Sequence, residues 1–414
     1  MAFSLNRSPL SSAASLVASL LVAMPAFAQI SDGVVKIGVI NDQSGPYSAL
    51  SGPGSALAVT MAVEDMKSQL GNIKVEVLVA DHQNKADLGV TIAKRWFDVE
   101  RLDAIMDVSN SAVALGIQTV IKEKNKIGMY GAIGTTELTG KQCVKTGYSW
   151  LHDSYALVSG PVRSILKSGG NTWYFVAADF AFGKNAVQVA KEILAANGGK
   201  SVGETYHPMS TSDYSSFLLQ AQSSNAKAVM FANGGAQLVN SMKQWKEFGM
   251  QDGKQKPVAT ILEISDVHAA GLDVIEGLSA TTAWYWDKDD QARAFGRRFF
   301  ERFKAMPTAT QASMYSAASH YLKAVVATKS DATDVVDAKM RSTPVNDMYV
   351  KNAMLRPDGK LSHDFLLVTV KSRADSKYPW DYYKVDATIP ASDALSPLSE
   401  SECPLVDRAG IKRK

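Results

Sequence analysis

Residues 34–66 read VVKIGVINDQSGPYSALSGPGSALAVTMAVEDM. The β-branched run at 34–40 predicts a strand, and the apolar residues spaced three to four apart over 54–67 predict a helix. The segment between them is rich in glycine, proline and hydroxyl side chains. A strand, a polar loop and a helix begin an α/β unit, and loops at this edge of a parallel sheet are where open α/β folds bind ligands.

The same alternation continues along the chain and restarts after about residue 150. Further strands are expected at 74–80, 102–109, 127–133, 172–179, 201–208, 227–233, 258–263, 347–355 and 364–371. Apolar strands separated by amphipathic helices are typical of parallel sheets that are covered on both faces. The stretches 148–155 and 278–286 look like strands that cross between two units, and the tail after residue 387 looks like a loop. The sequence therefore predicts two doubly wound α/β lobes and a stiff hinge.

The N-terminus has the pattern of a secretory signal peptide. Arg7 is followed by the apolar run SLVASLLVAMPAFA at 15–28, which ends in a small-x-small cleavage site. A membrane anchor is the alternative, but the run is too short to span a bilayer. No cysteine follows the run, so a lipoprotein anchor is not expected. We expect a signal peptide at 1–28, cleavage after Ala28, and a mature protein in the periplasm.

Composition and motifs argue against several function classes. The chain has 46% hydrophobic and 21% charged residues and a net charge of +3, without a basic run that would bind nucleic acid. It contains no G-x-S-x-G, P-loop or H-E-x-x-H motif, and its six histidines lack metal-ligand spacing. We therefore expect no enzymatic activity, no cofactor and no metal site.

The chain has two cysteines, Cys143 and Cys403. In an exported protein an even number of cysteines favours a disulfide, which here would tie the C-terminal tail to the middle of the chain. Two buried free thiols are the alternative.

The loops that follow the strands are rich in Gly, Ser, Thr and Asn, and their N–H and hydroxyl groups suit a carboxylate. Each loop could equally be a turn with a helix cap. Two ambiguities stay open. Trp284 and Trp286 could cover a ligand or pack at the hinge, and Glu263 and Asp266 could cap helices or bind an ammonium group.

Four segments together resemble a known family. They are IGVINDQSGPYSALSGPGSALAVTMAVED (37–65), GAIGTTELTG (131–140), AADFAFGKNA (177–186) and MPTATQASMYSAASHYLKAVV (306–326). In order and spacing they are similar to the leucine/isoleucine/valine-binding proteins, which are type I periplasmic substrate-binding proteins of ABC importers. The resemblance extends over about 33–370.

The resemblance implies two α/β lobes joined by three crossovers, with a ligand closed between them. Lobe one would comprise 29–150 plus 278–360, and lobe two 151–277 plus 361–414. The protein would be a monomeric, non-enzymatic solute-binding subunit whose partners are inner-membrane ABC permease subunits. The alternatives are a ligand sensor of the same fold that feeds a chemoreceptor or kinase, and a secreted α/β enzyme.

The resemblance also implies a ligand site. Its residues would be Tyr47, Leu50, Ser109, Asn110, Ser111, Ala132, Ile133, Gly134, Thr135, Phe182, Asn233, Gly234, Glu263 and Trp284. Small and hydroxyl residues would hold the ligand carboxylate, and Glu263 would hold an ammonium group. The chain departs from the family in the segment 132–135, which reads AIGT so that the usual threonine is displaced or replaced, and at Phe182, where the family usually has tyrosine. The expected ligand is therefore a small carboxylate, either a branched-chain or other amino acid or an aromatic acid.

Overall fold

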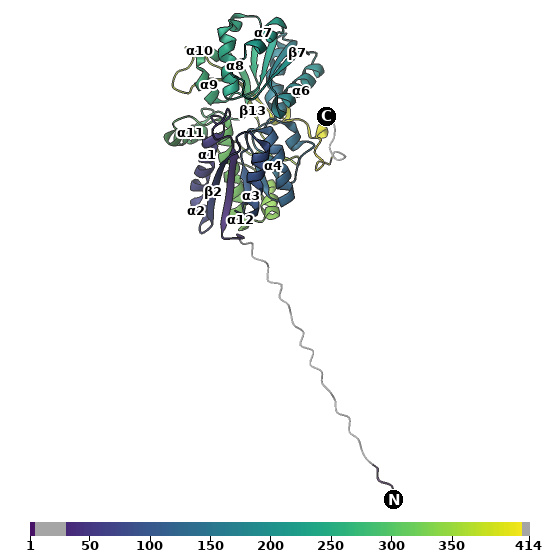
Figure 1. Ribbon diagram of the computed structural model, residues 1–414. Coiled ribbons are helices and arrows are strands. Elements are labelled where there is room, and N and C mark those ends of the chain that lie inside the picture. Colours follow the sequence, from purple (N-terminus) through teal and green to yellow (C-terminus); the bar gives the residue numbers. More distant parts are fainter. Residues whose placement is uncertain (5–29, 408–414) are drawn as a thin grey trace.

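The computed structural model of the protein describes residues 1–4 and 30–407, and within them two α/β lobes lie end to end (Figure 1). Most of the predicted signal peptide, with its cleavage site after Ala28, lies outside the described residues. Across the described part of the chain, no helix combines the length and apolar character that a membrane span requires.

Lobe one is built on a parallel sheet with strand order β2-β1-β3-β4-β5. Its strands are β1 (Val34–Asn41), β2 (Lys74–Asp81), β3 (Ala104–Met106), β4 (Ile127–Tyr130) and β5 (Gly147–Ser149). Its helices are α1 (Gly52–Asp65), α2 (Lys67–Leu70), α3 (Ala86–Asp98), α4 (Ser111–Lys124), α11 (Asp290–Phe303), α12 (Ala309–Thr328) and α13 (Thr333–Ser342), with a 3₁₀ turn η1 (Thr136–Thr139). All residues of β3 and β4 are buried, as expected for strands covered on both faces.

Lobe two has a larger, mixed sheet with strand order β14-β13-β10-β9-β8-β6-β7. Its strands are β6 (Thr172–Ala178), β7 (Lys200–His207), β8 (Ala228–Ala232), β9 (Lys256–Ala259), β10 (Ser279–Thr282), β13 (Phe365–Val370) and β14 (Tyr383–Ile389). Its helices are α5 (Ser154–Lys167), α6 (Ala181–Ala196), α7 (Ser215–Ser223), α8 (Ala236–Glu247), α9 (Ile264–Ala270), α10 (Leu272–Ile275) and α14 (Ala391–Ala394), with 3₁₀ turns η2 (Met250–Asp252) and η3 (Leu398–Glu400). The strands β13 and β14 run antiparallel to their neighbours.

The chain passes between the lobes three times, as predicted: after β5, after β10, and after a two-stranded sheet of β11 (Met354–Leu355) and β12 (Leu361–Ser362). One predicted boundary is wrong. Strand β10 pairs with β9 and β13 in the sheet of lobe two, so the return to lobe one comes after residue 282 and not at 278. The boundary was misplaced because β10 continues directly into the crossover, and no change in the sequence pattern marks the point where the strand ends.

Three other elements also differ from the prediction. The strand expected at 102–109 ends at Met106, because Asp107 adopts a left-handed φ of 54°. The strand expected at 347–355 is limited to β11, because the Asp347 side chain accepts hydrogen bonds from the backbone of Tyr349 and Val350 and forms a turn. Strand β14 was not predicted. It is an edge strand whose residues are mostly exposed, so it lacks the apolar pattern of a buried strand.

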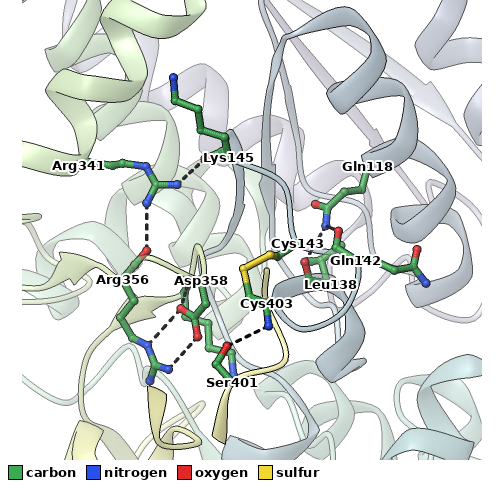
Figure 2. The surroundings of a disulfide bond; sticks show 11 residues. Gln118, Leu138, Gln142, Cys143, Lys145, Arg341, Arg356, Asp358, Ser401 and Cys403 are labelled. Carbon is green, nitrogen blue, oxygen red and sulfur yellow. Dashed lines mark hydrogen bonds and ion pairs between the residues drawn. A yellow bond between two sulfur atoms is a disulfide. The ribbon is translucent and has the colours of Figure 1, made fainter. Parts of the chain in front are cut away.

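A disulfide joins Cys143 and Cys403 across 260 residues, with a Cα–Cα distance of 5.5 Å (Figure 2). Cys143 lies in lobe one after η1, whereas Cys403 ends a tail that leaves lobe two after α14. The C-terminal segment accordingly lies beside the junction of the lobes (Figure 1). Nearby, the Arg356 guanidinium pairs with Asp358, and Arg341 donates to the Arg356 carbonyl oxygen. The bond therefore links the two lobes covalently, in addition to the three crossovers.

Candidate ligand site

A narrow cavity lies between the lobes at the carboxyl ends of the strands, with a volume of about 10 Å³. It is lined by Tyr47, Leu50, Ser109, Asn110, Ser111, Ala132 and Gly134 of lobe one, and by Phe180, Phe182 and Ile261 of lobe two. This is about the space of one water molecule, so the two walls are nearly in contact and a ligand can enter only after the lobes have separated.

The wall from lobe one carries hydrogen-bonding groups. Asn110 is the N-cap of α4, and its Oδ1 accepts from the N–H groups of Ala112 and Val113 at 2.9 and 3.2 Å. Ser109 Oγ and Ser111 Oγ each accept a backbone N–H, at 3.2 and 3.3 Å. A hydroxyl that accepts such a bond keeps its own proton to donate. Two hydroxyl donors at the positive end of a 14-residue helix favour an anion in the cavity.

The wall from lobe two is apolar. The rings of Phe180 and Phe182 have centroids 6.2 Å apart, and Phe180 lies 6.3 Å from the Tyr47 ring of lobe one. Ile261, just beyond the end of β9, completes this wall. Such rings bury the body of a small organic ligand and leave its polar end to the opposite wall.

Direct contacts hold the lobes together around the cavity. The Pro46 carbonyl of lobe one accepts a hydrogen bond from Ala236 N–H of lobe two at 3.1 Å, and the Tyr47 hydroxyl donates to Gln237 Oε1 at 3.2 Å. Burial raises the pKa of Tyr47 well above its usual range, with added effects of Tyr214 and Asp42, so this hydroxyl stays protonated. In this structure the two lobes are therefore in contact with each other, and the space between them is closed.

Eight of the fourteen predicted site residues line this cavity. Ile133 and Thr135 belong to the same loop but do not line it; Thr135 instead accepts from Glu137 N–H at 3.3 Å. Asn233 donates to Ser241 at 3.1 Å inside lobe two, and a side chain on Gly234 would press on Ile261. None of these four residues lines the cavity.

Trp284 lies outside the lining. Its Nε1–H donates to the Met348 carbonyl at 3.0 Å, and its ring meets Phe295 edge-on at 6.1 Å. The sequence left open whether Trp284 covers a ligand or packs at the hinge, and in the structure it packs at the crossover. The structure adds Phe180 and Ile261 to the lining. Phe180 stands out in the sequence as an aromatic residue beside Phe182, whereas Ile261 carries no sequence signal.

Glu263 also lies outside the lining, at the start of α9 in lobe two. Its Oε2 accepts from Ala309 N–H at 2.9 Å, and its Oε1 accepts from Thr310 N–H and Oγ1–H at 3.2 and 2.8 Å. These donors belong to the first turn of α12 in lobe one. Burial raises the pKa of Glu263 to about 7, while these hydrogen bonds lower it. Asp266 accepts from Glu263 N–H at 2.9 Å, and burial likewise raises its pKa to about 7.

Within residues 1–4 and 30–407, no group of three or more His, Cys, Asp or Glu side chains is arranged so that it could hold a metal ion. His82 and His152 are buried, and burial lowers the pKa of each to about 4, so both are neutral. Neither lines the cavity between the lobes.

Residues 34–376 match the family model described as periplasmic binding protein. The crystal structure of a periplasmic binding protein from Burkholderia mallei is 42% identical, covers 91% of this chain and 100% of that chain, and has a TM-score of 0.88. A branched-chain amino acid ABC transporter periplasmic ligand-binding protein from Burkholderia xenovorans is 39% identical, with coverages of 90% and 100% and a TM-score of 0.81.

A solute-binding protein from R. palustris, solved in complex with benzoate, is 16% identical, with coverages of 86% and 97% and a TM-score of 0.78. At this identity the likeness shows the fold alone. A search of curated proteins gave no match.

Proposed function

The chain belongs to the periplasmic binding protein family, and we propose that it is the solute-binding subunit of an ABC importer that captures a small carboxylate by closure of its two lobes. The observation that carries this proposal is the cavity itself. One lobe presents hydroxyls and a helix N-terminus, and the other presents aromatic rings.

The ligand contacts in this proposal are the residues that line the cavity. The Ser109 and Ser111 hydroxyls and the start of α4 bind the carboxylate. Phe180, Phe182 and Ile261 cover the body of the ligand after lobe two has rotated about the crossovers. The name of one relative supports this class of ligand, since it is a branched-chain amino acid ABC transporter periplasmic ligand-binding protein.

In the cell, the protein would be exported by the signal peptide at 1–28, act in the periplasm, and deliver its ligand to the permease subunits as a monomer. It would bind and release the ligand without chemical change. Membership of the periplasmic binding protein family supports the periplasmic location and the role in an ABC importer.

Binding is tested by thermal shift and isothermal titration of the mature protein with leucine, phenylalanine and benzoate. A ligand that binds only the native state raises the melting temperature. Small-angle scattering with and without that ligand then measures closure, which we expect as a smaller radius of gyration. Tight binding of a sugar or a polyamine, with no binding of any carboxylate, would overturn the proposal.

A further inference from the structure

We infer that the site takes a small organic acid that carries no amine, because Glu263, the acidic residue that could have met an ammonium group, instead caps helix α12 of the opposite lobe. This inference rests on the proposed function and narrows its ligand class. It also assigns Glu263 a role as a positioning residue for the closed form.

The lining of the cavity contains no side chain that could balance a positive charge. Its polar members are two serines, one asparagine and the Tyr47 hydroxyl, and the remaining members are apolar. The Asn110 oxygen, which could accept from an ammonium group, already accepts two N–H groups of α4. The cavity therefore offers donors to an anion but no carboxylate to a cation.

Two acidic residues of lobe one lie close to the lining, and both are engaged elsewhere. The Asp42 carboxylate accepts from the N–H groups of Gly45 and Tyr47 at 2.7 and 2.8 Å and holds the loop that contains Tyr47. Asp107 accepts from Asn41 and Ser51 at 2.9 Å on one oxygen. Its other oxygen is buried without a hydrogen-bond partner and faces Gly131, and neither residue lines the cavity.

In lobe two, Asp266 accepts a hydrogen bond from the Glu263 N–H, and Glu263 itself has both of its carboxylate oxygens occupied. Three donors from Ala309 and Thr310 converge on it at 2.8–3.2 Å. A carboxylate at the N-terminus of a 20-residue helix is well placed, because unpaired N–H groups and the helix dipole favour negative charge there. An ammonium group could recruit Glu263 only if this cap were broken.

The first turn of α12, which Glu263 caps, is also connected to the ligand site. Thr308, the N-cap of α12, donates from its hydroxyl to the carbonyl of Leu50 at 2.6 Å. Leu50 lines the cavity. Glu263 of lobe two therefore orients, through the first turn of α12, a residue of the lobe-one wall. Loss of the cap should weaken binding of every ligand alike, which differs from the effect expected of an ammonium ligand.

The test uses matched ligand pairs that differ only in the amine. Isothermal titration compares 4-methylpentanoate with leucine, and 3-phenylpropanoate with phenylalanine. We expect the amine-free member of at least one pair to bind about 100-fold more tightly than its amino acid, because a buried ammonium without a partner is strongly unfavourable. Affinities within tenfold in both pairs, or tighter binding of an amino acid, would overturn the inference.

Two variants test the role of Glu263. We expect Glu263→Gln and Thr310→Val each to weaken the preferred acid about tenfold, the effect of one hydrogen bond to a charged group. Because both remove the same contact, the double variant should be no weaker than about the worse single variant. The exposed Glu276→Gln is the control and should bind like wild type.

The outcomes separate this inference from the proposed function. Leucine binding that Glu263→Gln abolishes, with Thr310→Val unchanged, overturns the inference and leaves the proposed function standing. Binding of none of the four carboxylates, together with tight binding of a sugar or polyamine, overturns both. Tight binding of an amine-free acid with additive losses in the two variants overturns the role of Glu263 as a cap.

Discussion

The two walls of the cavity are chemically different, although both come from loops after parallel strands. The lobe-one wall carries hydroxyls and the start of α4 beside the apolar Leu50 and Ala132, whereas the lobe-two wall consists of Phe180, Phe182 and Ile261. Lobe one alone offers side-chain groups that bind an anion, and the lobe-two wall is entirely apolar. The difference indicates that lobe one recognises the charge of the ligand, whereas lobe two recognises its apolar body.

The largest effect should come from breaking the covalent link between the lobes. Replacing both Cys143 and Cys403 by serine should lower the free energy of unfolding by about 2–5 kcal/mol, the usual cost of losing a native disulfide. Denaturant unfolding of the mature protein measures it. Two free thiols per denatured, unreduced wild-type chain in a thiol titration would contradict the bond.

The buried carboxyl groups of Glu263 and Asp266 in lobe two should make the free energy of unfolding fall as the pH rises. The pKa of Glu263 is raised from 4.5 to about 7 and that of Asp266 from 3.8 to about 7, mainly by burial. These carboxyls hold protons in the native state that the unfolded chain has already lost. Their stabilising effect is complete below pH about 4 and is lost as the pH rises through 7.

Urea unfolding between pH 5 and pH 8 measures this slope. Asp266→Asn should flatten it, because the amide does not titrate. A free energy of unfolding that rises over this range would contradict the shifts.

The anion-binding wall is tested by Ser111→Ala. Loss of one hydroxyl donor to a charged ligand should weaken binding by about 1.5–3 kcal/mol, to a similar extent for every carboxylate, because the body of the ligand lies against the other lobe. Isothermal titration measures it. Ser223→Ala, exposed on α7, is the matched control and should change nothing. An effect confined to one ligand would contradict the proposal that lobe one recognises the charge and lobe two the body of the ligand.

Contact between the two walls is tested by Gly134→Ala. A Cβ at this position would overlap the Phe182 ring, which is bulky and buried. We expect binding to weaken by about 1–3 kcal/mol, the range for overpacking, because lobe two must stop short of full closure. Phe182→Leu in the same chain should restore part of the affinity. Wild-type affinity in Gly134→Ala alone would show that this contact does not accompany binding.

The smallest effect should come from trimming the apolar wall with Phe180→Ala. Phe180 is only partly buried, and losing about 40 Å² of apolar contact costs about 1 kcal/mol. The loss should grow with the size of the ligand body, unlike the loss in Ser111→Ala. Phe248→Ala, on the far side of lobe two with 40% of its surface exposed, is the control. Equal losses for small and large acids would argue against contact between this ring and the ligand.

Much of the fold and part of the site follow from the sequence alone. Strand and helix periods predicted the α/β lobes and the crossovers, because they are set by local burial. The sequence pattern predicted the loops after the strands, which parallel strands bring to one edge of the sheet, whereas the eight individual lining residues were predicted from the resemblance to the leucine/isoleucine/valine-binding proteins. Tyr47, Ser109 and Ser111 belong to this group.

Tertiary structure decided the roles that depend on distant partners. Glu263 could be a ligand or a cap by sequence, and the choice was made by Ala309, 46 residues away, where the first turn of α12 meets lobe two. Trp284 likewise lies at the crossover because Met348 accepts its N–H. A side chain's chemistry and its neighbours in the chain restrict what it can bind, but the partner that it binds depends on which distant surfaces the fold brings together.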